Sequence, residues 1–228
     1  MKALIYKEFK LALHPICYFF VLLFPLMILI PSYPLAIGFI YVITCYPIIF
    51  LGANKGQQSN DLLYSALLPI RKKDIVKARI ILITCIQFAF IAIMTALYPV
   101  ALTLSNSIVV EGGEAIAEVG LGLSAYVSLL GIIIVGYSIV DLIFFPIYYK
   151  NGKSIVKSTL FTIIGFIVYL LIFTILLTYI PGMEWYGTFL SGNIGYQFIV
   201  LGISLIIYVI IHIFVYNISS KRLERVDF

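Results

Sequence analysis

The sequence contains very little charge. Of its 228 residues, 63% are hydrophobic and only 11% are charged, whereas a soluble domain carries about 25% charged residues. A soluble fold of this length has no way to hide so much apolar surface. A helical membrane protein can carry it, because lipid solvates its outer face. The composition therefore excludes a soluble globular domain and predicts an all-α polytopic membrane protein.

Cysteine and histidine are also scarce. The three cysteines, Cys17, Cys45 and Cys85, lie in apolar runs, so no disulfide framework is indicated. His14 and His212 have no cysteine, histidine or glutamate partners at the spacing of metal ligands. We therefore expect neither a metal ion nor a cofactor on this chain.

Recognisable catalytic motifs are missing as well. Gly152-Lys153-Ser154 looks like the end of a phosphate-binding loop, but that motif requires a glycine where this chain has Ile147. The predicted spans contain one acid, Asp141, whereas intramembrane proteases need paired acids, a serine–lysine pair or histidine–glutamate motifs. The sequence predicts that the chain is not an enzyme, and no nucleic acid is expected as a partner.

The basic residues that are present lie in four clusters, and their spacing predicts the topology. The stretches 11–54, 80–149 and 158–220 contain no lysine or arginine. Basic residues near span ends collect on the cytoplasmic side, so each stretch must cross the membrane an even number of times. Because a span takes about 20 residues, each stretch holds one helical hairpin. This gives six transmembrane helices with both termini cytoplasmic.

The apolar runs agree with this plan. They predict spans near 17–31, 35–53, 79–104, 121–145, 158–180 and 196–217. Loops at 105–120 and 182–195 would then be extracellular, and 54–78 would be the longest cytoplasmic segment. Within residues 1–14 the apolar side chains share one helical face and the basic ones lie largely opposite, which indicates an amphipathic helix in the membrane interface. A frayed basic tail is the alternative.

Asp141 is the one ionisable residue predicted to lie within the bilayer. A charge there costs several kcal/mol, so such residues are functional candidates. Lys150 follows about 14 Å further along a helix, which places Asp141 toward the cytoplasmic side. Two roles stay open: a structural contact, for instance with a tyrosine hydroxyl, or a part in gating or proton handling at a water-filled vestibule.

The cytoplasmic segment 54–78 has its own helix signals. Ser59, Asn60 or Asp61 can cap a short helix that Pro69 ends, and a second helix starts near Arg71 and continues into the third span. The first helix has an apolar face with no lipid to cover it, which favours a protein partner. The basic run that follows could anchor the segment at the membrane, contact acids of a partner, or do both.

The stretch LLYSALLPIRKKDIVKARI, residues 62–80, resembles the cytoplasmic loop of bacterial ABC-2-type transporter permeases. The opening LIYKEFKLAL and the stretch FFPIYYKNGKSIVK are similar to two further segments of that family. The family pattern often has serine or threonine where this chain has Arg71. The residue that usually caps the helix before span three is then missing.

The resemblance implies a permease subunit of an ATP-driven exporter that pairs with a second permease chain, the same or different. A separate ATPase subunit would bind ATP and magnesium. The helix from Asp61 to Leu68 would be the coupling helix that contacts the ATPase. The predicted partner-binding residues are Asp61, Leu62, Leu63, Tyr64, Leu67, Leu68, Pro69, Arg71, Lys72 and Lys73.

The composition of the spans bears on the substrate. They are poor in charge and rich in aromatic residues, with 17 Tyr and 17 Phe in the chain, which favours a hydrophobic or amphipathic substrate. The resemblance extends to the short permeases that export phenol-soluble modulins and antimicrobial peptides. The alternative is a stand-alone membrane immunity protein that binds an antimicrobial peptide without ATP.

Overall fold

The computed structural model describes residues 2–11, 15–29, 49, 70–112, 127–151, 155–179 and 194–225. Within these ranges the regular structure is helical throughout, as predicted. The predicted second span, 35–53, and the predicted coupling helix, Asp61–Leu68, fall outside the described residues, apart from the buried Ile49.

The N-terminal part forms three short helices. Helix α1 (Lys2–Leu11) is the predicted amphipathic segment, α2 (Pro15–Leu23) follows, and the 3₁₀ helix η1 (Phe24–Leu29) continues from it. The predicted span near 17–31 is not one regular α-helix over its described part, because the helix tightens at Phe24. Pro25 has no backbone N–H to donate within an α-helix, which accounts for the change.

Helix α5 (Lys72–Gly112) is longer than the predicted span 79–104. It begins where the sequence indicated, and the N–H of Asp74 donates to the carbonyl oxygen of Arg71 at 2.8 Å. The Asp74 carboxylate in the first turn complements the helix dipole. The backbone of Arg71 and the side chain of Asp74 therefore stabilise a helix start that lacks the usual capping side chain.

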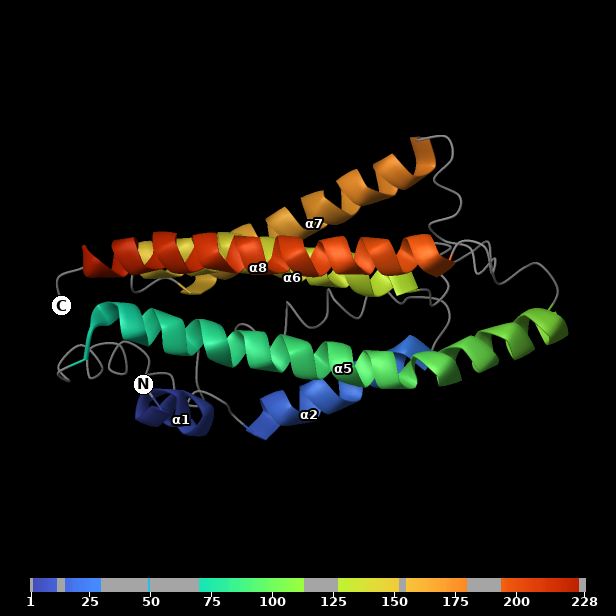
Figure 1. The fold of residues 1–228 in the computed structure, drawn as a ribbon, viewed down its shortest axis with the longest axis horizontal. Coiled ribbons are helices and arrows are strands. Elements are labelled where there is room, and N and C mark those ends of the chain that lie inside the picture. Colours follow the sequence, from blue (N-terminus) through green and yellow to red (C-terminus); the bar gives the residue numbers. More distant parts are fainter. Residues whose placement is uncertain are drawn as a thin grey trace.

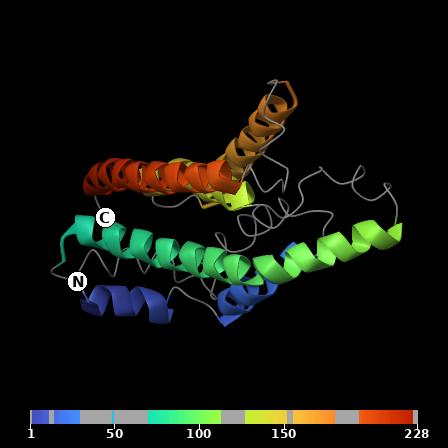
Figure 2. The same cartoon turned by 45° about the vertical axis from the view of Figure 1, so that its right-hand side comes forward.

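Helix α5 continues to Gly112, into the first part of the segment 105–120 that the sequence predicts as an extracellular loop. No glycine or proline interrupts residues 100–111, and Gly112 with Gly113 stands where helices commonly end. Pro99 does not end the helix. Figures 1 and 2 show α5 bent toward its C-terminal end, and a proline that removes one backbone hydrogen bond explains such a bend.

The C-terminal half consists of three long helices: α6 (Val127–Asn151), α7 (Ile155–Tyr179) and α8 (Ile194–Glu224). Together with α5 they are four helices long and apolar enough to cross a membrane. They correspond to the last four predicted spans. The described residues thus form an all-helical, multi-pass membrane protein, while the full count of six spans stays a prediction.

The helices pack in two groups. Helix α6 lies against α7 and α8, while α5 lies against α1, α2 and η1. The two groups meet mainly where α5 contacts α8, and Figures 1 and 2 show α7 diverging from the others. The α5–α8 seam is therefore the main described contact between the two groups.

Small residues bring α6 close to its neighbours. A Cβ atom added at Gly131 would lie 2.8 Å from Ser204 Oγ and 3.6 Å from the Cα of Leu201, both on α8. The Tyr169 hydroxyl of α7 donates to the carbonyl oxygen of Ile132 at 2.9 Å. Close backbone approach at small residues is the usual basis of helix association in lipid, where apolar burial gives no driving force.

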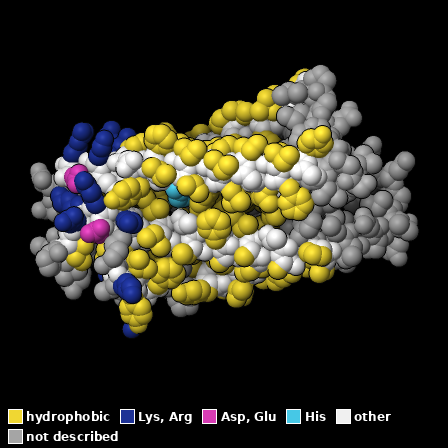
Figure 3. Space-filling view, in the orientation of Figure 1, with side chains coloured by type: hydrophobic (Ala, Val, Ile, Leu, Met, Phe, Trp, Pro, Cys, Tyr) yellow, Lys and Arg dark blue, Asp and Glu magenta, His cyan; other side chains and the backbone are white. Residues whose placement is uncertain are grey.

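The basic side chains lie at one end of the molecule. Helix α1, the start of α5, the end of α6 and the end of α8 all lie at one end of the molecule, near both termini (Figure 1). Lysine and arginine side chains gather at that end, as the dark blue atoms of Figure 3 show. We call it the basic end. The surface between it and the opposite end is largely apolar (Figure 3).

Candidate functional site

The buried polar residues of the spans converge at the α5–α8 seam. Asp141 on α6 is fully buried. Gln87 on α5, also fully buried, donates from Nε2 to Asp141 Oδ2 at 2.9 Å. The Asp141 carboxylate is thus buried in this structure and reaches a helix of the other group.

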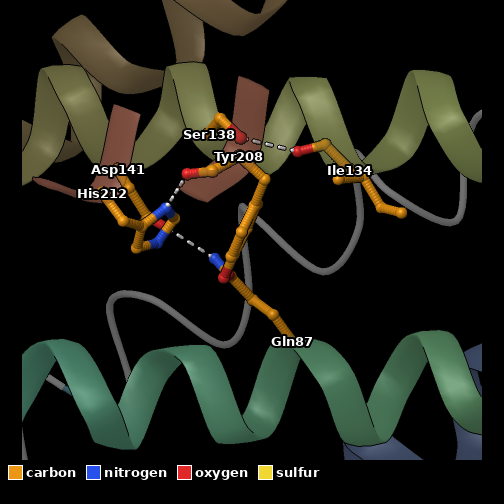
Figure 4. A network of polar contacts seen from close by, with 6 residues as sticks. All are labelled: Gln87, Ile134, Ser138, Asp141, Tyr208 and His212. Atoms are coloured by element: carbon orange, nitrogen blue, oxygen red, sulfur yellow. Dashed lines mark hydrogen bonds and ion pairs between the residues drawn. The ribbon is translucent and has the colours of Figure 1, made fainter. Parts of the chain in front are cut away.

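Helix α8 contributes two side chains that lie one turn apart. His212 Nε2 lies 3.0 Å from Asp141 Oδ2, and Nδ1 lies 2.9 Å from the carbonyl oxygen of Tyr208. The Tyr208 hydroxyl donates to Gln87 Oε1. The Tyr208 and His212 rings stack with their centroids 3.9 Å apart. Figure 4 shows the four side chains pointing toward one another from α5, α6 and α8.

The network is complementary in charge. Both ring nitrogens of His212 face oxygen atoms: Nε2 faces Asp141 Oδ2, and Nδ1 faces the carbonyl oxygen of Tyr208. Contact between an acidic and a basic side chain lowers the cost of placing ionisable groups in lipid.

The network connects the two helix groups. Gln87 belongs to the group of α5, whereas Asp141, Tyr208 and His212 belong to the group of α6 and α8. Any movement of one group against the other must break or rearrange these contacts. The same seam carries the edge-on aromatic contact of Phe88 with Tyr208, whose ring centroids are 5.4 Å apart. Among the described residues, no cluster of three histidine, cysteine or acidic side chains could hold a metal ion.

An apolar groove of about 370 Å³ runs along the outside of the seam. Residues of α5 from Lys77 to Phe88 form one wall, and residues of α8 from Tyr208 to Tyr216 form the other. Figure 3 shows this face, with a histidine in cyan among apolar side chains between the two helices. His212 is the member of the network with an exposed edge, at 11% of its side chain, and it lines the groove.

One ion pair and two hydrogen bonds connect the helices at the basic end. Lys73 Nζ lies 3.4 Å from Glu224 Oε1, and Lys72 Nζ lies 3.5 Å from the backbone oxygen of the same residue, which joins the start of α5 to the end of α8. Arg222 on α8 donates to the carbonyl oxygen of Pro146 at 2.6 Å, near the end of α6. A cation there complements the negative end of the α6 dipole.

A buried ion pair fixes α1 to α5. Arg79 Nε lies 2.7 Å from Glu8 Oε2, and the two side chains are 9% and 1% exposed. The sequence indicated an amphipathic helix at the membrane interface and assigned no contact to its acid, Glu8. The structure instead buries Glu8, together with Leu4, against the bundle. Arg79 is therefore a structural partner of α1 rather than a free charge of the basic run.

Of the residues predicted to bind a partner, the structure places three. Arg71 is exposed just before α5, Lys73 is exposed within its first turn, and Lys72 is half-buried beside it. Asp61, Leu62, Leu63, Tyr64, Leu67, Leu68 and Pro69 lie outside the described residues. Contact with a partner remains a prediction for all ten.

A family model described as ABC-2 family transporter protein matches residues 3–224. The chain belongs to the ABC-2 transporter family. Comparison with curated proteins and with solved structures gave no match. The family match covers every helix described above, so this ABC-2 protein is a membrane transport component, in agreement with the resemblance seen in the cytoplasmic segment.

In this ABC-2 protein Asp141 could be selected from the sequence as a candidate, whereas its partners could not. Gln87, Tyr208 and His212 lie far from Asp141 along the chain, and each is a single polar residue in an apolar run. The signal that could have linked these residues is their similar distance from the basic end along their helices. Counted from the helix ends at the basic end, Gln87, Asp141 and His212 lie 15, 10 and 12 residues in, or about 22, 15 and 18 Å along their helices.

Proposed function

We propose that this chain is the permease subunit of an ATP-driven exporter that moves a hydrophobic or amphipathic substrate, such as a peptide, out of a bacterial cell. The observation that carries the proposal is the family match over residues 3–224. A separate ATPase subunit supplies the energy and binds ATP with magnesium. The chain pairs with a second permease, either a copy of itself or a related chain.

The arrangement of the basic end supports this assignment. In the proposed complex the basic end faces the cytoplasm, and the Asp61–Leu68 segment contacts the ATPase. That segment leads through Arg71 directly into α5. Because α5 carries Gln87 and is fixed to α1 through Arg79, a push on its start acts on the α5–α8 seam as well.

The mechanism follows from the two helix groups. Closure of the ATPase pair would move α5 with α1 and α2, while α6, α7 and α8 stay together through their close contacts at Gly131 and Tyr169. The network of Gln87, Asp141 and His212 would hold the resting arrangement and rearrange during each cycle. The apolar walls of the spans suit a substrate with a large apolar surface.

The proposal is tested by gentle co-purification of the tagged chain from its native membrane. A soluble subunit that carries a phosphate-binding loop should remain bound in stoichiometric amount. Recovery of the chain alone, or only with copies of itself, would contradict the exporter assignment and favour the stand-alone immunity protein.

The Leu63→Asp/Leu67→Asp variant makes this test specific. These leucines are four residues apart and share one face of the expected coupling helix, so two charges there should abolish ATPase association without disturbing the spans. Ser65→Asp is the matched control, because position 65 lies on the opposite face. Full association and transport in the double variant would show that the coupling helix is assigned incorrectly.

A further inference from the structure

We infer that the groove between α5 and α8 is a binding site for one anionic phospholipid from the leaflet at the basic end. The phosphate contacts Lys77 and one acyl chain lies along the groove. This goes beyond the transport function and does not depend on it. Two features point to this site: a lysine that pairs with none of the described residues, and an apolar groove that starts beside it.

Lys77 differs from the other basic residues of α5. Lys72 and Lys73 contact Glu224, and Arg79 contacts the buried Glu8. Among the described residues Lys77 makes no hydrogen bond or ion pair, its side chain is exposed, and it lines the groove. One cation of the cluster is thus available for an external anion.

The groove has the length of one lipid leaflet. From Lys77 to Phe88 along α5 is about 16 Å at the rise of an α-helix, and half of the hydrocarbon core of a bilayer is about 15 Å. Its walls are mainly aliphatic and aromatic, including Ile81, Val209 and Ile213. A chain that begins at Lys77 therefore ends near the middle of the membrane.

The chemistry at each end fixes the orientation of the lipid. A lysine near the membrane surface can extend its ammonium group to the headgroup level while its methylene stem stays in apolar surroundings. The deeper part of the groove offers Thr84, Tyr208 and His212, and Tyr208 and His212 already face Gln87 and Asp141. The lysine of the groove lining lies at its other end, so the headgroup belongs there and an acyl chain suits the remainder.

The test is native mass spectrometry of the purified full chain titrated separately with phosphatidylglycerol and phosphatidylcholine. We expect the anionic lipid to bind more tightly, and Lys77→Gln to weaken its binding about five-fold, the effect of one interfacial charge. Lys73→Gln is the matched control, since that lysine lies one turn earlier and is paired with Glu224. Equal effects of the two substitutions, or equal binding of the two lipids, would overturn the inference.

A second pair of variants tests the groove itself. Val209→Trp should fill it and reduce binding of phosphatidylglycerol, whereas Ile210→Trp, the next residue on α8 and outside the groove, should not. Both side chains are exposed, so neither substitution disturbs the folded core. Unchanged binding in Val209→Trp would show that the lipid sits elsewhere.

Two further measurements distinguish the lipid from other occupants of the groove. If inorganic phosphate displaced the lipid completely, Lys77 would be an anion site without an acyl chain, and the inference would fail. Disulfide-linked dimers of an Ile213→Cys variant, prepared without the native cysteines, would show that a second copy of the chain covers the groove. We expect neither result.

Discussion

At the scale of single residues, one oxygen atom of Asp141 joins three helices. Oδ2 lies 2.9 Å from Gln87 Nε2 and 3.0 Å from His212 Nε2. Asparagine can offer its carbonyl oxygen at the same place and keep both contacts, whereas alanine removes them. The two substitutions therefore separate hydrogen bonding from charge.

We predict that Asp141→Ala lowers the free energy of unfolding by about 1–3 kcal/mol, because it leaves buried polar groups without an acceptor. Asp141→Asn should lower the free energy of unfolding by less than half as much. The measurement is denaturant unfolding in mixed micelles.

Ser138→Ala is the matched control for both substitutions. Ser138 lies one turn earlier on α6, and its hydroxyl donates to the carbonyl oxygen of Ile134 within its own helix at 2.9 Å. Loss of this hydrogen bond should lower the free energy of unfolding only slightly. If Asp141→Ala cost no more than Ser138→Ala, the network would not be a stabilising contact between the helix groups.

At the scale of helices, α6 and α8 pack closely because Gly131 has no side chain. A larger residue there meets Ser204, which can rotate, and then the backbone at Leu201, which cannot. We predict that Gly131→Leu destabilises the protein by about 1–3 kcal/mol, as overpacking does in close-packed interiors. Thermal unfolding in detergent measures the effect.

Gly202→Leu on α8 provides the comparison. A Cβ atom at this position meets no atom within 4 Å, so the added side chain points into lipid and replaces a weak helix former by a strong one. This variant should be as stable as the unmodified chain or slightly more so. Equal destabilisation by the two leucines would mean that α6 and α8 do not pack as described.

At the scale of the whole molecule, the basic end should face the cytoplasm. We predict that a membrane-impermeant maleimide labels Ala115→Cys in intact cells but labels Arg225→Cys only after lysis, in a background without the native cysteines. Arg225 lies at the basic end and Ala115 in the predicted extracellular loop. The reverse pattern would invert the proposed topology.

The long helices could be predicted because each is an apolar run with a basic cluster at one end, and the family resemblance rested on the basic run itself. The positions at which a proline interrupts a helix were harder to predict. Pro25 turns an apolar run into a 3₁₀ segment, whereas Pro99 and Pro146 remain inside α5 and α6, since neighbouring helices determine whether a proline is accommodated.

The contacts of the candidate site could not be predicted in the same way. Gln87 and Asp141 are 54 residues apart, and Tyr208 and Gln87 are 121 apart. No periodicity within one helix specifies which side chains of another helix it will meet. The burial of Glu8 was missed for the same reason, because its partner Arg79 lies on α5 and reads as part of an exposed basic cluster.

The Glu8–Arg79 pair also constrains how the protein is made. Glu8 leaves the ribosome 71 residues before Arg79 (79 − 8), an interval of roughly 4–14 s at ordinary synthesis rates. Placing the Glu8 carboxylate in lipid without Arg79 is energetically unfavourable. Helix α1 must therefore stay at the membrane–water interface during that interval. Helix α1 reaches its final position only when the start of α5 arrives, so it docks later than its place before α5 in the sequence would indicate.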